Sequence, residues 1–298
     1  MNFARPKLTP MNFQLELETL IRARYPVLCI VTSEETRVQE TVLEIAARRQ
    51  KKVFEWSCTI GIVPAGASIQ SQKSRNPGTK DPLAALDHVI EQVEPALYLF
   101  KDFHPFLSKA HPAVIRKLKE IALHLKNSFK TIILVSPVME IPTELEKEIT
   151  VLNFPLPSRD DLAGLLDRIV AEVSARKDVR IDLDEAARDR LLQAALGLTL
   201  GEAENVFARI IVKHGRLSGE DLPEVFAEKQ QIIRKSGLLE YFAAREDFDR
   251  IGGLELLKQW LLKRGRAFCL EARQFGLPAP RGILLLGVQG CGKSLCAK

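Results

Sequence analysis

One short segment near the end of the sequence restricts the fold more than any other feature. Residues 287–294 read GVQGCGKS and match the pattern GxxxxGK[ST] at every fixed position. The segment directly follows the apolar run Ile283 to Leu286, and a helix is predicted to begin near Lys293. A strand that passes through a glycine-rich turn into a helix is a building unit of α/β folds with a parallel sheet.

The residue types in this segment fit the binding of a polyphosphate. Glycines permit the tight backbone curl in which successive N–H groups point at phosphate oxygens, and the start of the following helix adds positive potential. Lys293 is expected to neutralise the β- and γ-phosphates, and the Ser294 hydroxyl to ligate Mg²⁺. A chance match on a glycine turn is the alternative, but the preceding strand and following helix argue against it. The predicted ATP and Mg²⁺ site consists of Gly287, Val288, Gln289, Gly290, Cys291, Gly292, Lys293 and Ser294.

Apolar runs alternate with helical stripes over the first half of the chain. Strands are predicted at residues 27–31, 52–56, 96–100 and 131–136, helices at 11–24, 35–46 and 113–125, and a loop at 68–82. Such alternation predicts an α/β module whose parallel sheet is covered by helices on both faces.

The pattern changes after residue 157, where only helical stripes follow, at 162–169, 186–196, 203–212 and 223–235. A connector at 236–247 leads to a second strand, turn and helix sequence. We therefore predict an α/β core without a phosphate loop at 1–157, a helical lid at 158–240, and the incomplete start of a second module at 241–298.

Charge, cysteines and hydropathy exclude several classes of protein. Residues 256–298 contain eight Lys and Arg but only one acidic residue, Glu271, and so carry a net charge of +7. Since the whole chain carries +5, the preceding residues carry −2. We therefore expect no nucleic-acid binding by the first module. The five cysteines form no CxxC pair, which argues against a zinc site or a disulfide framework. No apolar stretch is long enough for a membrane helix, so we expect no membrane insertion and a cytoplasmic location.

The sequence FDRIGGLELLKQWL, followed by RGILLLGVQGCGKSLCAK, resembles the AAA family of ATPases in its opening turn, first helix, first strand and phosphate loop. Val288-Gln289 in place of the usual Pro-Pro is similar to the uncharacterised AAA proteins encoded as a hypothetical reading frame in cyanobacteria and red-algal plastids. A plastid-encoded protein would lie in the stroma. The resemblance implies that Ile251 and Gly252 pack on the adenine, whereas Arg250 stands where many members have Asp.

The same resemblance makes the first 240 residues a degenerate AAA module. Thr32-Ser33-Glu34-Glu35-Thr36 stands where the phosphate loop should follow the first strand, and its carboxylates would repel a triphosphate. Asp102 resembles the acidic residue that holds Mg²⁺, but Phe103 replaces the hydrolytic Glu that normally follows it, so we expect Asp102 to be a structural carboxylate at the strand end and not a metal ligand. Ser136 falls where the family places a polar sensor, and residues 153–157 resemble its link to the helical lid.

Three hypotheses follow for the function. The first is an ATPase that couples hydrolysis to the remodelling or regulation of a protein partner, which the resemblance extends to a homo-oligomeric ring in the intact protein. The motif lies only four residues before Lys298, so we predict a truncated site and assign no catalytic residue to this chain. The second is a non-catalytic interaction or regulatory module built on the degenerate fold. The third, a nucleic-acid motor related to clamp loaders, is disfavoured by the charge of the first module.

Overall fold

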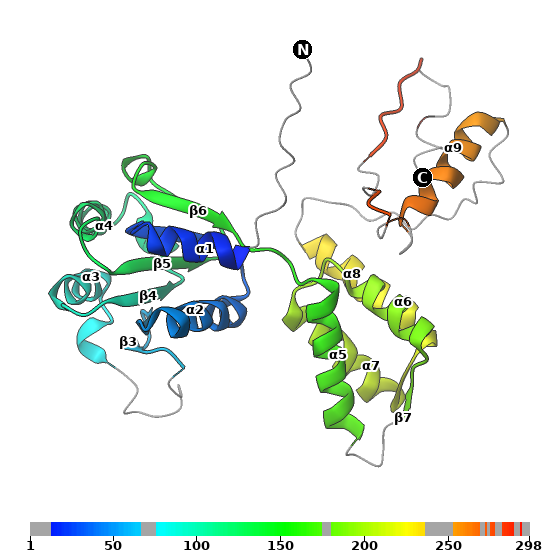
Figure 1. Ribbon diagram of the computed structural model, residues 1–298, viewed down its shortest axis with the longest axis horizontal. Coiled ribbons are helices and arrows are strands. Elements are labelled where there is room, and N and C mark those ends of the chain that lie inside the picture. Colours follow the sequence, from blue (N-terminus) through cyan, green and yellow to red (C-terminus); the bar gives the residue numbers. More distant parts are fainter. Residues whose placement is uncertain are drawn as a thin grey trace. The chain divides into compact units, whose positions relative to one another are not determined.

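The computed structural model describes residues 13–66, 76–174, 180–235, 253–268, 272, 275–277, 282–288 and 293 (Figure 1). It divides into two compact units, Met1–Val225 and Phe226–Lys298, and each unit is described by itself below.

A six-stranded sheet with the order β3-β2-β4-β5-β1-β6 forms the centre of the first unit (Figure 1). Its strands are β1 (Val27–Val31), β2 (Lys52–Ser57), β3 (Gly61–Pro64), β4 (Ala96–Lys101), β5 (Thr131–Ser136) and β6 (Ile149–Asn153). All neighbouring strands pair in parallel except β2 and β3, which are antiparallel. The predicted parallel sheet is confirmed, with β1, β2, β4 and β5 in the expected segments.

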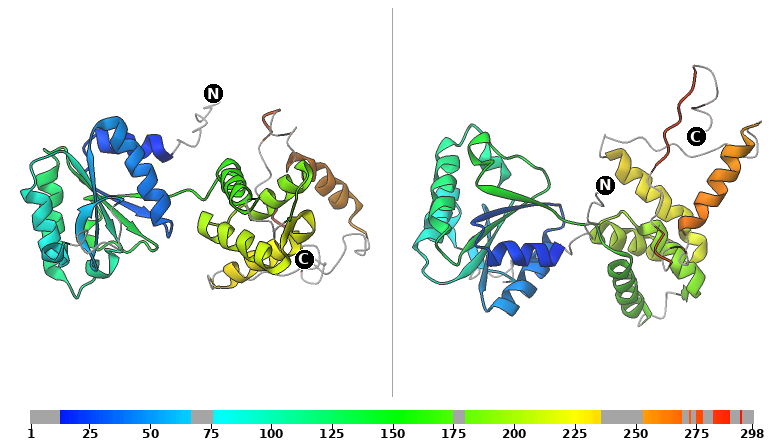
Figure 2. Two further views of the ribbon diagram at one scale, coloured as in Figure 1. Left: turned by 90° about the horizontal axis from the view of Figure 1, so that it is seen from below. Right: turned by 45° about the horizontal axis from the view of Figure 1, so that its top comes forward.

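Two helix pairs cover opposite faces of this sheet, because alternate residues of each buried strand point to opposite sides. Leu28 and Ile30 of β1 pack in a core with α1 (Phe13–Arg22) and α2 (Glu35–Arg49). Val27 and Cys29 pack in a second core with α3 (Pro82–Glu91) and α4 (Pro112–Leu125). Figure 2 shows the sheet edge-on between these layers. Short 3₁₀ turns lie at η2 (Pro77–Thr79), η3 (His104–Leu107) and η4 (Thr143–Leu145).

Helix α3 was not expected, and its two ends are stabilised in different ways, the first by a local cap and the second by a tertiary contact. Asp81 caps its N-terminus by accepting hydrogen bonds from the backbone N–H groups of Leu83 (2.9 Å) and Ala84 (3.0 Å). At the other end, the buried Lys130 donates to the carbonyls of Val89 (2.7 Å) and Gln92 (2.6 Å). A cation at these carbonyls satisfies acceptors that have no partner within the helix.

A helical lobe, residues 159–225, completes the first unit. It contains α5 (Arg159–Ser174), α6 (Glu185–Ala195), α7 (Leu200–His214), η5 (Gly219–Asp221) and the start of α8 (Leu222–Lys235). The expectation of helices alone is corrected by a short parallel pair, β7 (Arg180–Asp182) with β8 (Arg216–Ser218). Three-residue strands carry too little alternation to be recognised from sequence.

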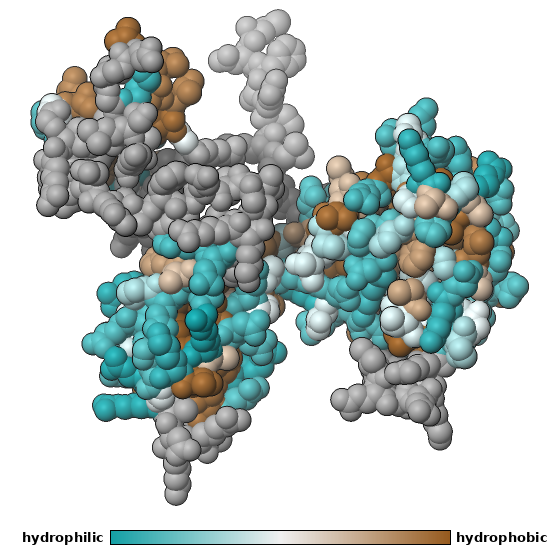
Figure 3. All heavy atoms as spheres, turned by 180° about the vertical axis from the view of Figure 1, so that it is seen from behind, coloured by the Kyte–Doolittle hydropathy of each residue, from teal (hydrophilic) through white to brown (hydrophobic). Residues whose placement is uncertain are grey.

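The second unit contains α9 (Glu255–Gly265), followed by η7 (Arg266–Phe268). Residues 283–286, predicted as a strand, adopt no regular structure, because a strand needs a hydrogen-bonded neighbour and the described residues of this unit offer none. Leu256, Leu284 and Leu286 are each at least 80% exposed. At the upper left of Figure 3, hydrophobic atoms lie at the surface among the described residues. None of the helices in the described ranges has the length and apolar character that a membrane crossing requires.

Candidate nucleotide sites

The glycine-rich segment of the second unit is described at Gly287, Val288 and Lys293. The Lys293 ammonium donates to the carbonyl oxygens of Gly287 (2.8 Å) and Val288 (2.6 Å), so its side chain folds back over the start of the loop. The other predicted contacts lie outside the described residues: Gln289, Gly290, Cys291, Gly292 and Ser294, together with Ile251 and Gly252. Glycines, a lysine and a hydroxyl form a donor set that fits a Mg²⁺-bound triphosphate, and the assignment of these residues stays a prediction.

The corresponding edge of the first unit is formed by the carboxyl ends of β1, β4 and β5. The backbone N–H of Thr32 donates to Ser136 O (2.8 Å), and that of Asp102 donates to Val135 O (3.0 Å), so the three strand ends lie together. Ligands of parallel α/β sheets bind at such an edge. The sequence therefore places Glu34, Asp102 and Ser136 where a nucleotide would be expected.

Phe103 and Ser136 are engaged in the protein itself. The Phe103 side chain is fully buried, and its ring centroid lies 5.3 Å from that of Trp56 and 5.4 Å from that of Phe100. Ser136 is buried, and its hydroxyl donates to the carbonyl of Val138 (2.7 Å). Phe103, which the family resemblance places at the position of the hydrolytic Glu, thus belongs to the aromatic core.

A buried ion pair lies beside this edge and had no signal in the sequence. Lys101 Nζ lies 2.6 Å from Glu55 Oε2 and also donates to Gln39 Oε1 (2.7 Å). Burial raises the pKa of the neighbouring Glu35, an effect opposed by Lys101 and reinforced by Asp102 and Glu55. Within the described ranges, no cluster of three His, Cys, Asp or Glu side chains could hold a metal ion.

The turn after β1 holds an acidic side chain in the position of the phosphate loop. Glu34 Oε1 accepts a hydrogen bond from the backbone N–H of Leu200 (2.8 Å), and Glu34 Oε2 accepts one from Arg37 (2.8 Å). These residues line a cleft of about 540 Å³ between the sheet and the helical lobe. The cleft is bordered by Glu34, Glu35, Glu40 and Glu204 against Arg37 and Arg168. Its excess of carboxylates does not fit a triphosphate.

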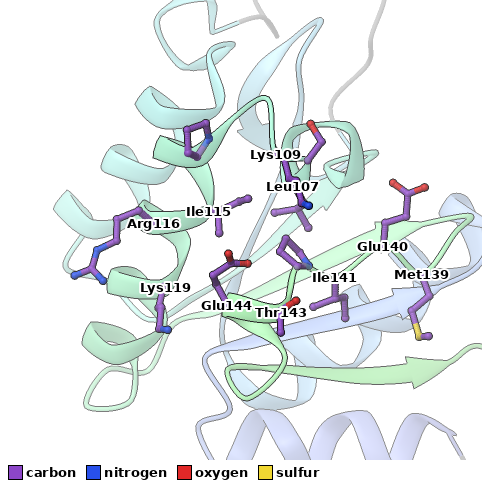
Figure 4. A pocket seen from close by; sticks show the side chains of 13 residues that line it. Leu107, Lys109, Ile115, Arg116, Lys119, Met139, Glu140, Ile141, Thr143 and Glu144 are labelled. Carbon is purple, nitrogen blue, oxygen red and sulfur yellow. The ribbon is translucent and has the colours of Figure 1, made fainter.

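A separate groove of about 670 Å³ lies between α4 and the loop that follows β5 (Figure 4). Its walls include the apolar side chains of Leu107, Ile115 and Ile141, and Met139 at its rim is 64% exposed. Figure 4 shows Lys119 on the α4 side and Glu140 on the opposite side. This groove was not predictable from the sequence, because its residues come from three separate segments.

Comparison with known proteins identifies the family. The family model of the SpoVK-like AAA ATPase N-terminal domain matches residues 13–154, and that of the second domain of the same family matches residues 160–236. The chain is 36% identical over 292 residues to the uncharacterized AAA domain-containing protein ycf46 of Trieres chinensis, covering 97% of this chain and 56% of that protein. The ycf46 protein of Guillardia theta is 35% identical, with 97% and 55% covered. The chain thus spans about half the length of the curated relatives it matches.

A solved structure gives the same fold. The structure titled C. elegans PCH-2 superposes with a TM-score of 0.50 at 14% identity, covering 75% of this chain and 70% of that chain. At this identity the likeness concerns the fold alone. With two models of one family matching more than half of the chain between them, and ycf46 proteins aligned over nearly all of it, the chain belongs to the SpoVK-like AAA ATPases.

Proposed function

We propose that the whole protein binds ATP and Mg²⁺ at residues 287–294 and uses hydrolysis to remodel or regulate a protein partner, as a ring of identical subunits. The observation that carries this proposal is the complete GxxxxGKS motif, with the Lys293 ammonium lying over the carbonyls of Gly287 and Val288. Bound ATP would supply the phosphate oxygens that draw this ammonium from the carbonyls. Ser294 would hold Mg²⁺, whose charge offsets that of the phosphates.

The test is a calorimetric titration of the whole protein with Mg·ATP. We expect binding with one nucleotide per chain, and loss of at least tenfold in affinity for Lys293→Ala, because the lysine is a principal counter-charge of the phosphates. Lys298→Ala, a lysine just beyond the motif, is the matched control and should bind normally. No measurable affinity in the unaltered protein would overturn the proposal. Sedimentation velocity with and without ATP tests the ring.

The first unit supports a second role, that of a non-catalytic module that acts through protein contacts. Phe103 is buried, and Glu34 stands where a phosphate would lie, so this unit lacks both the cradle and the hydrolytic carboxylate. The same titration tests this role by its stoichiometry. Two nucleotides per chain in the unaltered protein would show that the first unit holds a nucleotide and would contradict the proposal.

A further inference from the structure

Glu34 occupies an unusual place for a residue at the start of a helix. It is the N-cap residue of α2, yet its side chain makes no capping hydrogen bond to α2. Its carboxylate instead reaches α7, at Leu200, which is 166 residues away in sequence. The side chain is only 8% exposed, so this carboxylate is a buried charge with defined partners.

Helix α7 has a free donor at the point that Glu34 contacts. Thr199 and Glu202 form a capping box, in which the Thr199 hydroxyl accepts from Glu202 N–H and the Glu202 carboxylate accepts from Thr199 N–H. This box leaves the N–H of Leu200 unsatisfied within its own helix. Glu34 Oε1 accepts it at 2.8 Å, and the positive end of the helix dipole favours the negative charge there.

Arg37 connects the same carboxylate to the segment between the two lobes. Its guanidinium donates to Glu34 Oε2 (2.8 Å) and to the Pro155 carbonyl (2.7 Å), and lies 4.6 Å from the ring centroid of Phe154. Its second terminal nitrogen is 3.6 Å from a carboxylate oxygen of Asp161 on α5. One acidic and one basic residue at the start of α2 therefore contact the connector and two helices of the helical lobe.

We infer that the Glu34 carboxylate holds the helical lobe against the sheet of the first unit. This carboxylate lies where a nucleotide phosphate would otherwise contact both lobes. A helix N-terminus and an arginine are the groups that bind a phosphate in such a cleft. Here both are satisfied by a side chain of the protein. The arrangement of these lobes is then independent of nucleotide. The proposed function states only that the first unit does not hydrolyse ATP, so this inference adds to it.

The test measures the separation of the lobes and the protection of one amide. Spin labels are placed at Val93→Cys in the sheet lobe and Val212→Cys in the helical lobe, which are 94% and 85% exposed, after replacement of the native cysteines. Glu34→Ala should broaden the distance distribution and accelerate hydrogen exchange of the Leu200 amide at least tenfold. Glu40→Ala, which removes an exposed carboxylate that lines the same cleft, is the matched control and should leave both unchanged.

A second Glu34 variant and a measurement with Mg·ATP complete the test. If Glu34→Ala loses its far-ultraviolet circular dichroism, Glu34→Gln, which keeps the size and an acceptor oxygen, should still accelerate Leu200 exchange at least threefold. Mg·ATP added in a Lys293→Ala background should leave the distance distribution unchanged, whether or not the second unit binds nucleotide. The inference is overturned if the folded Glu34 variants keep the separation and Leu200 protection of the unaltered protein, or if Mg·ATP changes the separation in that background.

Discussion

Lys101 Nζ lies 2.6 Å from Oε2 of Glu55, and the Glu55 side chain is only 4% exposed. The pair joins Lys101, the last residue of β4, to Glu55 within the neighbouring strand β2. A charge buried to this extent is tolerated because its partner compensates the loss of hydration.

Removing the lysine should therefore destabilise the first unit strongly. We expect Lys101→Met to lower the free energy of unfolding by about 3 kcal/mol, because Glu55 is left without a counter-charge. The double variant Lys101→Met/Glu55→Gln should recover a large part of this loss. Lys52→Met is the matched control, since Lys52 and its partner Glu94 are both more than 60% exposed, and should cost less than about 1 kcal/mol. Urea denaturation measures all four proteins, and equal losses in the two lysine variants would contradict the expectation.

Restoring the residue type of an active AAA module at position 103 should damage the fold. Because Phe103 is fully buried against Trp56 and Phe100, Phe103→Glu is expected to lower the free energy of unfolding by more than about 3 kcal/mol. Phe103→Leu, which stays apolar, should cost about 1–2 kcal/mol. Trp56 fluorescence in a Trp260→Phe background reports the transition of this core. A Glu variant as stable as the Leu variant would show that the side chain reaches the cleft.

The parts of the fold that the sequence predicts are those with strong local patterns. Strands β1, β4 and β5 are nearly continuous buried apolar runs, and their expected bounds agree closely with the structure. Helix α3 was missed although Asp81 and Pro82 form a local start signal, and its C-terminal end depends on Lys130, whose contact with the Val89 carbonyl spans 41 residues. Such a contact leaves no periodic signal within the helix itself.

In the candidate sites, too, contiguous motifs were predictable from the sequence, whereas contacts between residues far apart in the chain were not. The glycine-rich motif is contiguous, so it is visible in the sequence, as is the absence of glycine and lysine around Glu34. The contact of Glu34 with Leu200 was not predictable, because it depends on how α7 approaches the sheet. The burial of Phe103 likewise requires the positions of Trp56 and Phe100 on two different strands.

Two cysteines of the first unit should differ greatly in how fast their thiols react with a maleimide. Cys58 is exposed, whereas Cys29 lies within β1 and burial raises the pKa of its thiol to about 11. Since the thiolate is the reactive form, we expect a maleimide at pH 7.5 to modify Cys58 at least a hundredfold faster than Cys29. Peptide mapping by mass spectrometry separates the two sites, and denaturation in urea before labelling is the control that should equalise them. Comparable rates in the native protein would mean that β1 opens readily.

The stability of the first unit should carry a pH dependence that originates at Glu35. Burial raises the pKa of this carboxyl above 4.5 in the folded protein, so folding favours the protonated form. Its contribution to stability is fully present below pH 4.5 and is lost as the pH rises through the raised pKa. Glu35→Gln should therefore have a higher melting temperature than the unaltered protein at pH 7, with the difference vanishing near pH 4. Glu40 is an exposed position on the same helix, so Glu40→Gln should have the melting temperature of the unaltered protein at both pH values. The opposite result would be a Glu35→Gln protein that is less stable than the unaltered protein at pH 7 but equally stable at pH 4. It would show that the partners of Glu35 stabilise its charged form more than burial destabilises it.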